Sequence, residues 1–196
     1  MTGHQSLRTA SGIVHCDISA GNIMMNEEYT NSSWKAFLID LDYAYNQRRL
    51  GRSGAPHNAG TKVFMSVGAL LNKKHTFMHD LESFFWVLFW ICIHYTGPTD
   101  SRIVSTFEQW NYLKASDLAM LKLGTASNGL VFLATTKKFF TPYFQPLIPC
   151  MDRLRKVFFN KNETWRKEDE QVYSRMRRVL RKAMEDPRVL AKWPRD

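Results

Sequence analysis

The apolar positions of this chain follow a different pattern in its first third than in the rest. Short apolar runs at 13–14, 23–25 and 36–39 are each bounded by Gly, Asn, Ser or Asp. Short runs with turn-forming residues at both ends predict β-strands. Residues 45–60 show no period and are rich in Gly, Arg, Asn and Pro. We therefore expect short strands and loops up to residue 60, ending in one long loop.

From residue 80 onward the pattern predicts helices. The stretch LESFFWVLFWICIHY that follows Asp80 is apolar on all sides, which is typical of a helix buried in the middle of a domain. We expect this central helix over 80–95 and a helical remainder over 100–196. The remainder is predicted to contain helices at about 103–122 and 168–185, separated by a segment broken at Pro142, Pro146 and Pro149. The predicted fold class is mainly α with a few short β-strands.

Composition narrows the class of protein. A length of 196 residues suits one domain. Apolar residues make up 44% of the chain and aromatic residues 13%, which excludes a disordered or collagen-like chain and provides for a buried core. The net charge of +9 gathers toward the C-terminus, and we interpret it as the solvated face of a basic helix. Nucleic acid is not expected as a partner.

Cysteine spacing and hydropathy indicate an intracellular protein. Cys16, Cys92 and Cys150 are far apart and form no Cys-x-x-Cys pair, which argues against a disulfide framework and a zinc-thiolate site. The first residues lack the apolar core of a signal peptide, and the longest apolar run, 84–93, is shorter than the roughly 18 residues that span a membrane. We expect a soluble cytoplasmic or nuclear protein, not secreted and without a membrane partner.

Three polar residues predict phosphoryl-transfer chemistry. Asp17 is followed five residues later by Asn22, and Asp40 ends an apolar strand. Magnesium-assisted phosphoryl transfer needs one carboxylate beside the attacking hydroxyl, and an amide oxygen and a second carboxylate on the metal. Each residue alone is a common turn residue. Together, at this spacing, they favour the catalytic interpretation.

Four motifs resemble those of protein kinases. His15–Asn22 resembles the catalytic loop H-R-D-x-x-x-x-N, and Asp-Leu-Asp at 40–42 resembles D-F-G. GTKVFMS at 60–66 is similar to the G-T-x-x-Y-M-A that closes an activation segment, and HDLESFF at 79–85 to the start of the buried F helix. In this order, over residues 13–95, the motifs are similar above all to the fungal-type protein kinase family. Further along, only the helical character agrees.

The resemblance implies an ATP-dependent kinase that phosphorylates a protein substrate, on Ser or Thr rather than Tyr, with ATP and Mg²⁺ as cofactors. It makes Asp17 the base or orienting carboxylate for the substrate hydroxyl. Asn22 and Asp40 become the ligands of the metal and its nucleotide. Ser19 takes the catalytic-loop position at which Ser/Thr kinases carry Lys.

Three further residues are implied as structural support. Thr61 would hydrogen-bond near Asp17, and Asp80 would hold the catalytic-loop backbone, to which His15 belongs. For Asp80 an ordinary helix N-cap is an equal alternative. The activation segment would cover 43–68.

Departures from the kinase pattern shape the remaining expectations. Cys16 stands where most kinases have Arg, and Gly68 where the Glu of A-P-E would be. Only 14 residues precede His15, with no glycine-rich loop and no strand Lys among them. We therefore expect a kinase-like C-terminal lobe without its N-terminal lobe, with little activity alone. The missing lobe or a partner chain would then cover the central helix.

Two other functions compete with this interpretation. A small-molecule kinase of the aminoglycoside or choline type has a similar catalytic loop, but lacks segments like 60–66 and 79–85. A catalytically dead interaction module would fit a missing lobe, but an intact set of site residues argues against it. His75 and His79, four residues apart, could both face a metal ion, although capping or core roles are favoured.

Overall fold

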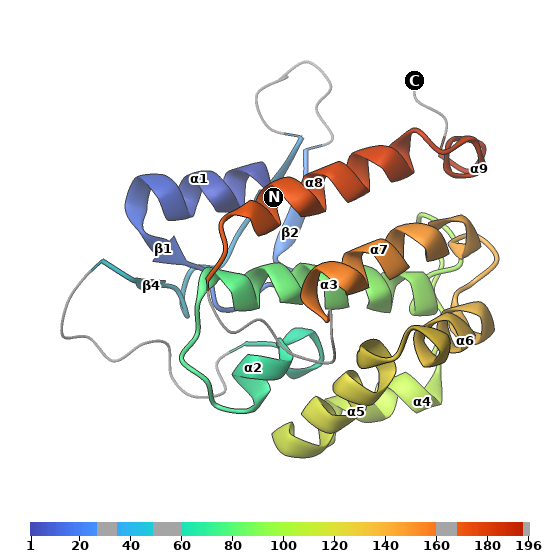
Figure 1. Cartoon of the computed structure of the whole chain (residues 1–196), viewed down its shortest axis with the longest axis horizontal. Helices are drawn as coiled ribbons and strands as arrows, with labels where there is room; N and C mark the ends of the chain where they lie inside the picture. Colours follow the sequence, from blue (N-terminus) through green and yellow to red (C-terminus); the bar gives the residue numbers. More distant parts are fainter. Residues whose placement is uncertain (27–34, 49–59, 160–167, 194–196) are drawn as a thin grey trace. The chain divides into compact units, whose positions relative to one another are not determined.

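The computed structural model describes residues 1–26, 35–48, 60–159 and 168–193. The chain folds into two compact units, Met1–Val87 and Leu88–Asp196. The structure is mainly helical with a few short strands, as predicted (Figure 1). One long helix, α3 (Phe77–His94), begins in the first unit and ends in the second.

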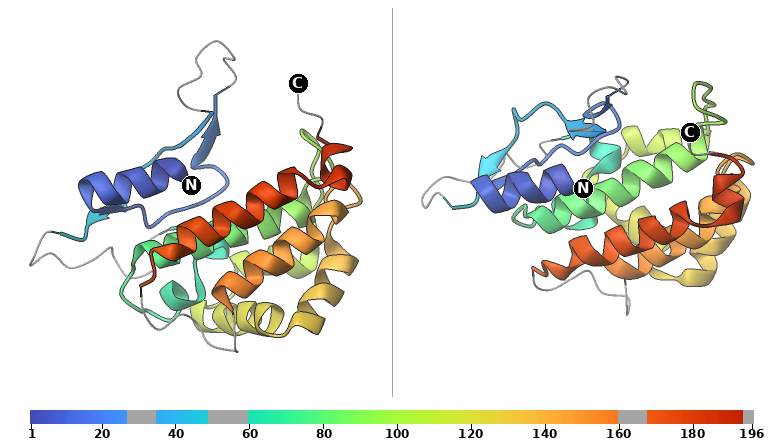
Figure 2. Two further views of the ribbon diagram at one scale, coloured as in Figure 1. Left: turned by 45° about the horizontal axis from the view of Figure 1, so that its top comes forward. Right: turned by 90° about the horizontal axis from the view of Figure 1, so that it is seen from above.

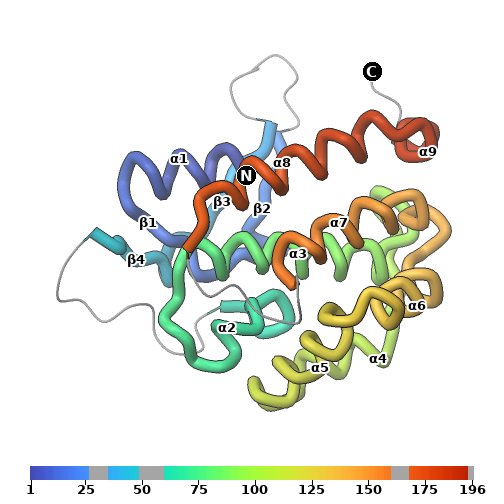
Figure 3. Tube along the Cα trace, viewed as in Figure 1, coloured from blue at the N-terminus to red at the C-terminus, as the bar shows by residue number. Residues whose placement is uncertain are grey.

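The first unit contains two small antiparallel sheets. Strand β1 (Ile13–Val14) pairs with β4 (Tyr45–Asn46), and β2 (Ile23–Met25) pairs with β3 (Ala36–Leu38) (Figure 3). The three predicted strands are confirmed, while β4 lies in the stretch predicted as a loop. Residues 49–59 of that stretch, which also belong to the expected activation segment, lie outside the described residues.

Helix α1 (Thr2–Ser11) opens the first unit and was not predicted (Figure 2). Its buried residue is His4, and the guanidinium of Arg8 lies 3.7 Å from the centroid of the Phe77 ring. Polar side chains thus anchor this helix, so no apolar stripe marks it in the sequence. It ends at Gly12, whose left-handed φ of 70° and N–H bond to the carbonyl of Arg8 form a typical helix C-cap.

Helix α3 is buried on all sides, as its apolar sequence predicted. Every residue in it is buried or half-buried. It starts at Phe77, three residues earlier than expected, so Asp80 lies inside the first turn and the N-cap interpretation was wrong. The amide of Thr76 instead donates to Nδ1 of His79 over 2.9 Å. Before α3 come the 3₁₀ turn η1 (Lys62–Phe64) and the short helix α2 (Val67–Leu70).

The second unit is helical, as predicted, but its helices begin and end at other residues than the sequence indicated. Its helices and 3₁₀ turns after α3 are α4 (Ser105–Glu108), η2 (Gln109–Asn111), α5 (Ala115–Ser127), α6 (Gly129–Phe139), η3 (Gln145–Leu147), α7 (Ile148–Phe158), α8 (Gln171–Met184) and α9 (Pro187–Leu190). The single helix expected over 103–122 is wrong, because Lys114 is extended, at φ −62° and ψ 151°, and starts a new helix. Pro146 and Pro149 occupy first turns, where proline begins a helix instead of breaking it.

Aromatic side chains form the core of the second unit. The ring of Phe89 lies with centroids 5.7–6.3 Å from those of Phe107, Trp110, Phe132 and Phe140. Helices α7 and α8 lie side by side (Figures 1 and 2). The buried residues of α8 are Val172, Tyr173, Met176 and Ala183, while basic residues such as Arg178 and Lys182 are exposed, as expected for a solvated face.

No single helix in the described ranges is long and apolar enough to cross a membrane. Helices α5 and α6 together reach the necessary length and composition, but they meet at an angle of 98°. Core helices of soluble proteins share these properties, so this pair is weak evidence for a membrane span.

Candidate active site

The carboxylate of Asp17 is held in place by two other predicted site residues. Its Oδ1 accepts hydrogen bonds from the backbone N–H of Thr61 over 2.8 Å and from the Thr61 hydroxyl over 3.1 Å. Its Oδ2 accepts a bond from Nδ2 of Asn22 over 3.2 Å. The predicted hydrogen bond between Thr61 and Asp17 is confirmed, and it ties the catalytic loop to the start of η1.

Asn22 closes the catalytic loop on itself. Its Nδ2 also donates to the carbonyl of Asp17 over 3.0 Å, and its backbone N–H donates to Oγ of Ser19 over 3.2 Å. Within the described parts of the chain, this leaves Oδ1 of Asn22 without a hydrogen-bond partner. The carbonyl of Asn22 accepts a bond from the amide of Ile39 over 3.1 Å, which joins the loop to the residue preceding Asp40.

Asp40 is exposed and has a left-handed backbone. Its φ is 64°, a region that Asp tolerates better than most residues because its short side chain can bond locally. That bond is present: Oδ1 of Asp40 accepts from the amide of Asp42 over 3.3 Å. The turn presents the carboxylate to solvent at the end of β3.

Ser19 is buried in the loop. Its side-chain oxygen accepts the Asn22 amide, and only 4% of the residue is exposed. A short hydroxyl in this position stabilises the loop conformation on which Asn22 depends. The structure thus gives this predicted catalytic residue a positioning contact.

Asp80 supports the loop from below and accepts four N–H bonds. Its Oδ2 accepts from the amide of His15 over 2.8 Å and from Nε2 of His4 over 2.9 Å. Its Oδ1 accepts from the amide of Cys16 over 3.1 Å and from Nε2 of His75 over 2.8 Å. Burial alone would raise the pKa of Asp80, but the hydrogen bonds from His4 and His75 outweigh it and hold that pKa well below its usual value.

Sequence reasoning missed the roles of His4 and His75. His4 lies 76 residues before Asp80 in a helix without an apolar stripe, so nothing local indicated the pairing. His75 was considered only together with His79. The hydrogen-bond partner of His75 is Asp80, five residues later. Because α3 starts at Phe77, Asp80 lies in its first turn, within reach of His75.

His15 links the loop to the strand that carries Asp40. Its Nε2 lies 3.0 Å from the carbonyl of Ile39, while its Nδ1 lies 3.3 Å from the amide of Asp17. The ring is fully buried, so these bonds form away from water. His15 thus connects the loop to the residue preceding Asp40.

Gly60 allows the chain to pass close to the catalytic loop. Its φ is 105°, and a Cβ added there would lie 2.8 Å from the carbonyl oxygen of Cys16 and 3.2 Å from Oδ1 of Asp17. A larger residue would therefore displace the Thr61 amide from the carboxylate that it binds.

The end of the activation segment is anchored by Glu82. Its Oε1 accepts the amide of Val67 over 2.7 Å and Nε1 of Trp86 over 3.0 Å. At the neighbouring Gly68, where kinases carry a Glu, a Cβ would lie 2.4 Å from Nε2 of His79. A buried carboxylate from α3 thus holds a segment that the residue at position 68 cannot anchor.

Several exposed apolar side chains lie on and just after the β2–β3 hairpin. Six of them are between 39% and 76% exposed: Met24, Met25, Phe37, Ile39, Leu41 and Tyr43. Met24 is two residues after Asn22, and Ile39 and Leu41 flank Asp40. Exposed apolar side chains therefore lie close in sequence to both candidate metal ligands.

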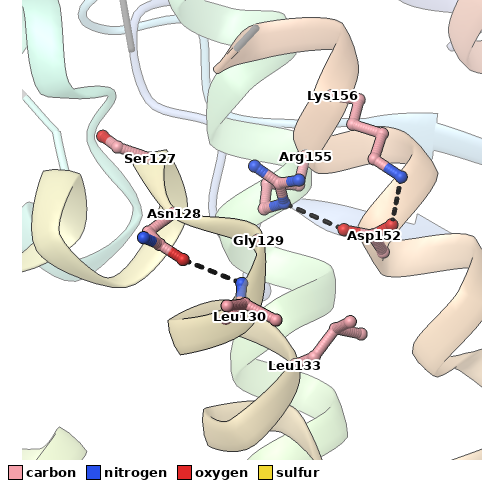
Figure 4. A pocket seen from close by; sticks show the side chains of 8 residues that line it. All are labelled: Ser127, Asn128, Gly129, Leu130, Leu133, Asp152, Arg155 and Lys156. Atoms are coloured by element: carbon pink, nitrogen blue, oxygen red, sulfur yellow. Dashed lines mark hydrogen bonds and ion pairs between the residues drawn. The ribbon is translucent and has the colours of Figure 1, made fainter. Parts of the chain in front are cut away.

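A separate pocket of about 450 Å³ lies in the second unit, at the start of α6 (Figure 4). Its charged residues are paired with each other, since Asp152 accepts from Nε of Arg155 over 3.0 Å and from Nζ of Lys156 over 2.6 Å. The Asn128 side chain already caps α6 by accepting the amide of Leu130 over 2.8 Å. These groups satisfy one another, so the pocket has no evident chemistry of its own.

Comparison with known proteins agrees with the geometry of the first unit. Residues 1–92 match the family model described as fungal protein kinase. The matched segment contains the catalytic loop, Asp40, Thr61 and all of α3 up to Cys92. No curated protein matches the sequence. This match supports the family predicted from the motifs: residues 1–92, a little under half of the chain, are similar to fungal protein kinases.

Proposed function

We propose that this chain transfers the terminal phosphoryl group of ATP to a Ser or Thr hydroxyl of a protein substrate. The observation that supports this most is the fixed carboxylate of Asp17, oriented by Thr61 on one oxygen and by Asn22 on the other. A carboxylate held in this way can orient an acceptor hydroxyl and accept its proton during transfer. Positioning of this kind is the main contribution of a protein to phosphoryl transfer.

Asn22 and Asp40 fit a magnesium ion by the chemistry of their donors. Mg²⁺ takes hard oxygen ligands, and both residues offer oxygen. In the described residues, Oδ1 of Asn22 has no hydrogen-bond partner because Nδ2 makes the bonds to Asp17, and the carboxylate of Asp40 is exposed. A bound Mg²⁺ would neutralise phosphate charge that develops during transfer.

The exposed apolar side chains beside these ligands suit a nucleotide base. Met24 and Ile39 lie close in sequence to Asn22 and Asp40, and both are about two-fifths exposed. Flat aromatic bases favour apolar surface, while their phosphates need the metal. ATP would thus contact the β2–β3 hairpin with its base and the Asn22–Asp40 side with its phosphates.

Metal binding provides a first test. Mn²⁺, which shares the oxygen preference of Mg²⁺, should broaden NMR signals of the catalytic loop in the wild-type chain. Asp40→Ala should weaken this binding at least tenfold. Asp42→Ala removes an exposed carboxylate two residues away and should leave the binding unchanged. Broadening that persists in Asp40→Ala, or is lost in Asp42→Ala instead, would overturn the assignment of the metal ligands.

Phosphoryl transfer provides the second test. With labelled ATP and Mg²⁺, the wild-type chain should label a Ser/Thr-rich protein acceptor above an enzyme-free blank. Asp17→Asn keeps the size of the side chain but removes its basicity, so transfer should fall by about 10²–10⁴-fold. The exposed Asp100→Asn serves as the control and should keep full activity. Full transfer by Asp17→Asn, or none by the wild type, would contradict the proposal.

A further inference from the structure

A sulfur, a nitrogen and a carboxylate oxygen meet beneath the catalytic loop. Sγ of Cys16, a ring nitrogen of His75 and a carboxylate oxygen of Asp80 lie within 4.8 Å of one another. Within this group, Nε2 of His75 is 2.8 Å from Oδ1 of Asp80. The three residues come from the loop after β1, the loop before α3 and the first turn of α3. All three belong to the first unit.

This donor set matches zinc and not magnesium. Zn²⁺ binds Cys sulfur, His nitrogen and Asp oxygen, usually as four ligands in a tetrahedron. With bonds of about 2.0–2.3 Å, the ligand atoms of such an ion lie roughly 3–4 Å apart, a spacing that these donors reach with small side-chain shifts. Mg²⁺ prefers oxygen ligands alone.

We propose that Cys16, His75 and Asp80 bind a zinc-class divalent metal ion, with a water molecule as the fourth ligand. This site is separate from the one proposed at Asn22 and Asp40 and does not depend on it. Binding exchanges the thiol proton of Cys16 for the metal and releases that proton to solvent. The hydrogen of the His75 ring then moves from Nε2 to Nδ1, so that Nε2 can bind the ion.

The surroundings of the three donors favour a cation. Burial, followed by the nearby carboxylates of Asp80 and Asp17, raises the pKa of the Cys16 thiol. The same two carboxylates create a negative potential that attracts a metal cation. The His75 side chain is 11% exposed while that of Asp80 is 1% exposed, so an ion would enter from the His75 side.

His79 does not belong to this donor cluster, although it lies near His75. Its ring lies 5.0 Å from that of His75, centroid to centroid. Its Nδ1, however, accepts the amide of Thr76. His79 therefore has the capping role that the sequence favoured, while Nε2 of His75 faces Asp80 inside the cluster.

A metal ion here would connect the catalytic loop to α3. Cys16 occupies the position at which most kinases have Arg. Metal binding would make the charge next to Asp17 more positive by one unit, because Zn²⁺ brings two positive charges and the Cys16 thiol loses its proton. Asp80 already accepts the amides of His15 and Cys16, and its metal bond would stiffen the same junction. The order of the loop that carries Asp17 would then depend on the metal.

Cobalt provides a direct test, because tetrahedral Co²⁺ bound to a thiolate has visible and near-ultraviolet absorption bands that reveal a Cys ligand. The reduced, metal-free wild-type chain should develop these bands with one equivalent of Co²⁺ and lose them when Zn²⁺ is added. A large excess of Mg²⁺ should not remove them. Cys16→Ser and His75→Gln should each bind Co²⁺ at least tenfold more weakly, and Cys16→Ser should lose the thiolate band.

The double variant Cys92→Ser/Cys150→Ser is the matched control. It removes the other two buried thiols, both in the second unit, and should keep the bands. Bands that persist in Cys16→Ser but vanish in the double variant would overturn the proposal, as would their absence from the wild type. His75→Gln keeps all three thiols, so unchanged affinity in that variant would also count against the site. Circular dichroism without metal establishes that each variant is folded.

Discussion

At the scale of single residues, Asp80 supports the candidate site through its hydrogen bonds. It is fully buried, and a buried carboxylate destabilises a fold unless it is fully hydrogen-bonded. Four N–H groups satisfy it, two from the catalytic-loop backbone and two from the histidines at positions 4 and 75. The loop conformation therefore depends on the charge of one side chain that cannot touch substrate itself.

We predict that Asp80→Asn destabilises the chain although the two side chains have the same shape. The new amide nitrogen faces N–H donors, and at least the backbone amide of His15 or Cys16 loses its acceptor. An unsatisfied buried donor costs about 1–3 kcal/mol, and the free energy of unfolding should fall by at least that amount in urea titrations. The exposed Asp100→Asn should change it by less than about 0.5 kcal/mol.

The loss should be the same at every pH from about 5 to 8. Because the pKa of Asp80 is below its usual value, its stabilisation is complete above the unfolded-state pKa of about 4. It disappears only as the pH falls through the lower folded-state pKa. Equal stability of Asp80→Asn and wild type, or a difference that disappears at neutral pH, would show that the hydrogen-bonded carboxylate is not what holds the loop.

Residues that belong to a contiguous motif could be predicted from the sequence, and those that meet it only in space could not. The spacing of Asp17 and Asn22 indicated their proximity, and the motif that contains Thr61 indicated its bond to Asp17. His4 and Asp80 are 76 residues apart and lie in different helices, so no local pattern indicates their pairing. Sequence patterns report neighbours along a helix or strand, not partners brought together by folding.

At the scale of elements, contacts between α2 and α3 hold the segment around Gly68, a residue that has no side chain to anchor it. Gly68, in α2, occupies the position of the Glu with which many kinases anchor this segment. Here Glu82 of α3 binds the amide of Val67 instead, and the ring of His79 fills the space beside Gly68. The absence of a side chain at position 68 is therefore a packing requirement of this junction.

We predict that Gly68→Ala is destabilising whereas Gly124→Ala is stabilising, although both glycines lie in helices. The new Cβ at position 68 would lie 2.4 Å from Nε2 of His79, which is 1% exposed and closely packed. Overpacking of this kind costs about 1–3 kcal/mol. At Gly124 in α5 nothing lies within 4 Å, so the helix should gain about 0.5–1 kcal/mol. Thermal melts of the two variants compare them; a neutral or stabilising Gly68→Ala would contradict the packing argument.

Elements were predictable where apolar residues determine them. The all-round apolar pattern correctly identified α3, and short apolar runs identified β2 and β3. Helix α1 was not predicted, because the side chains that anchor it, His4 and Arg8, are polar. The helix break at Lys114 was not predictable, because one extended residue does not change the helical composition of the surrounding segment.

At the scale of the whole molecule, α3 is a continuous helix that contributes residues to both units. Residues 77–87 of this helix belong to the first unit and residues 88–94 to the second. Leu81 and Phe85 are buried in the first part, and Phe89 and Ile93 in the second. Because helix formation is cooperative, loss of one half removes hydrogen-bonded turns from the other. We infer that the two units unfold together.

The three buried cysteines make this inference measurable, since Cys16 reports on the first unit and Cys92 and Cys150 on the second. Pulses of a thiol reagent at increasing urea, read for each cysteine by peptide mass spectrometry, should give one common midpoint. Leu154→Ala, which empties a buried site in α7, should lower all three midpoints together, because it costs about 2–5 kcal/mol of a shared transition. The exposed Leu130→Ala should leave them unchanged. If Cys16 kept its wild-type midpoint in Leu154→Ala while the other two shifted, the units would be independent and α3 would not couple them.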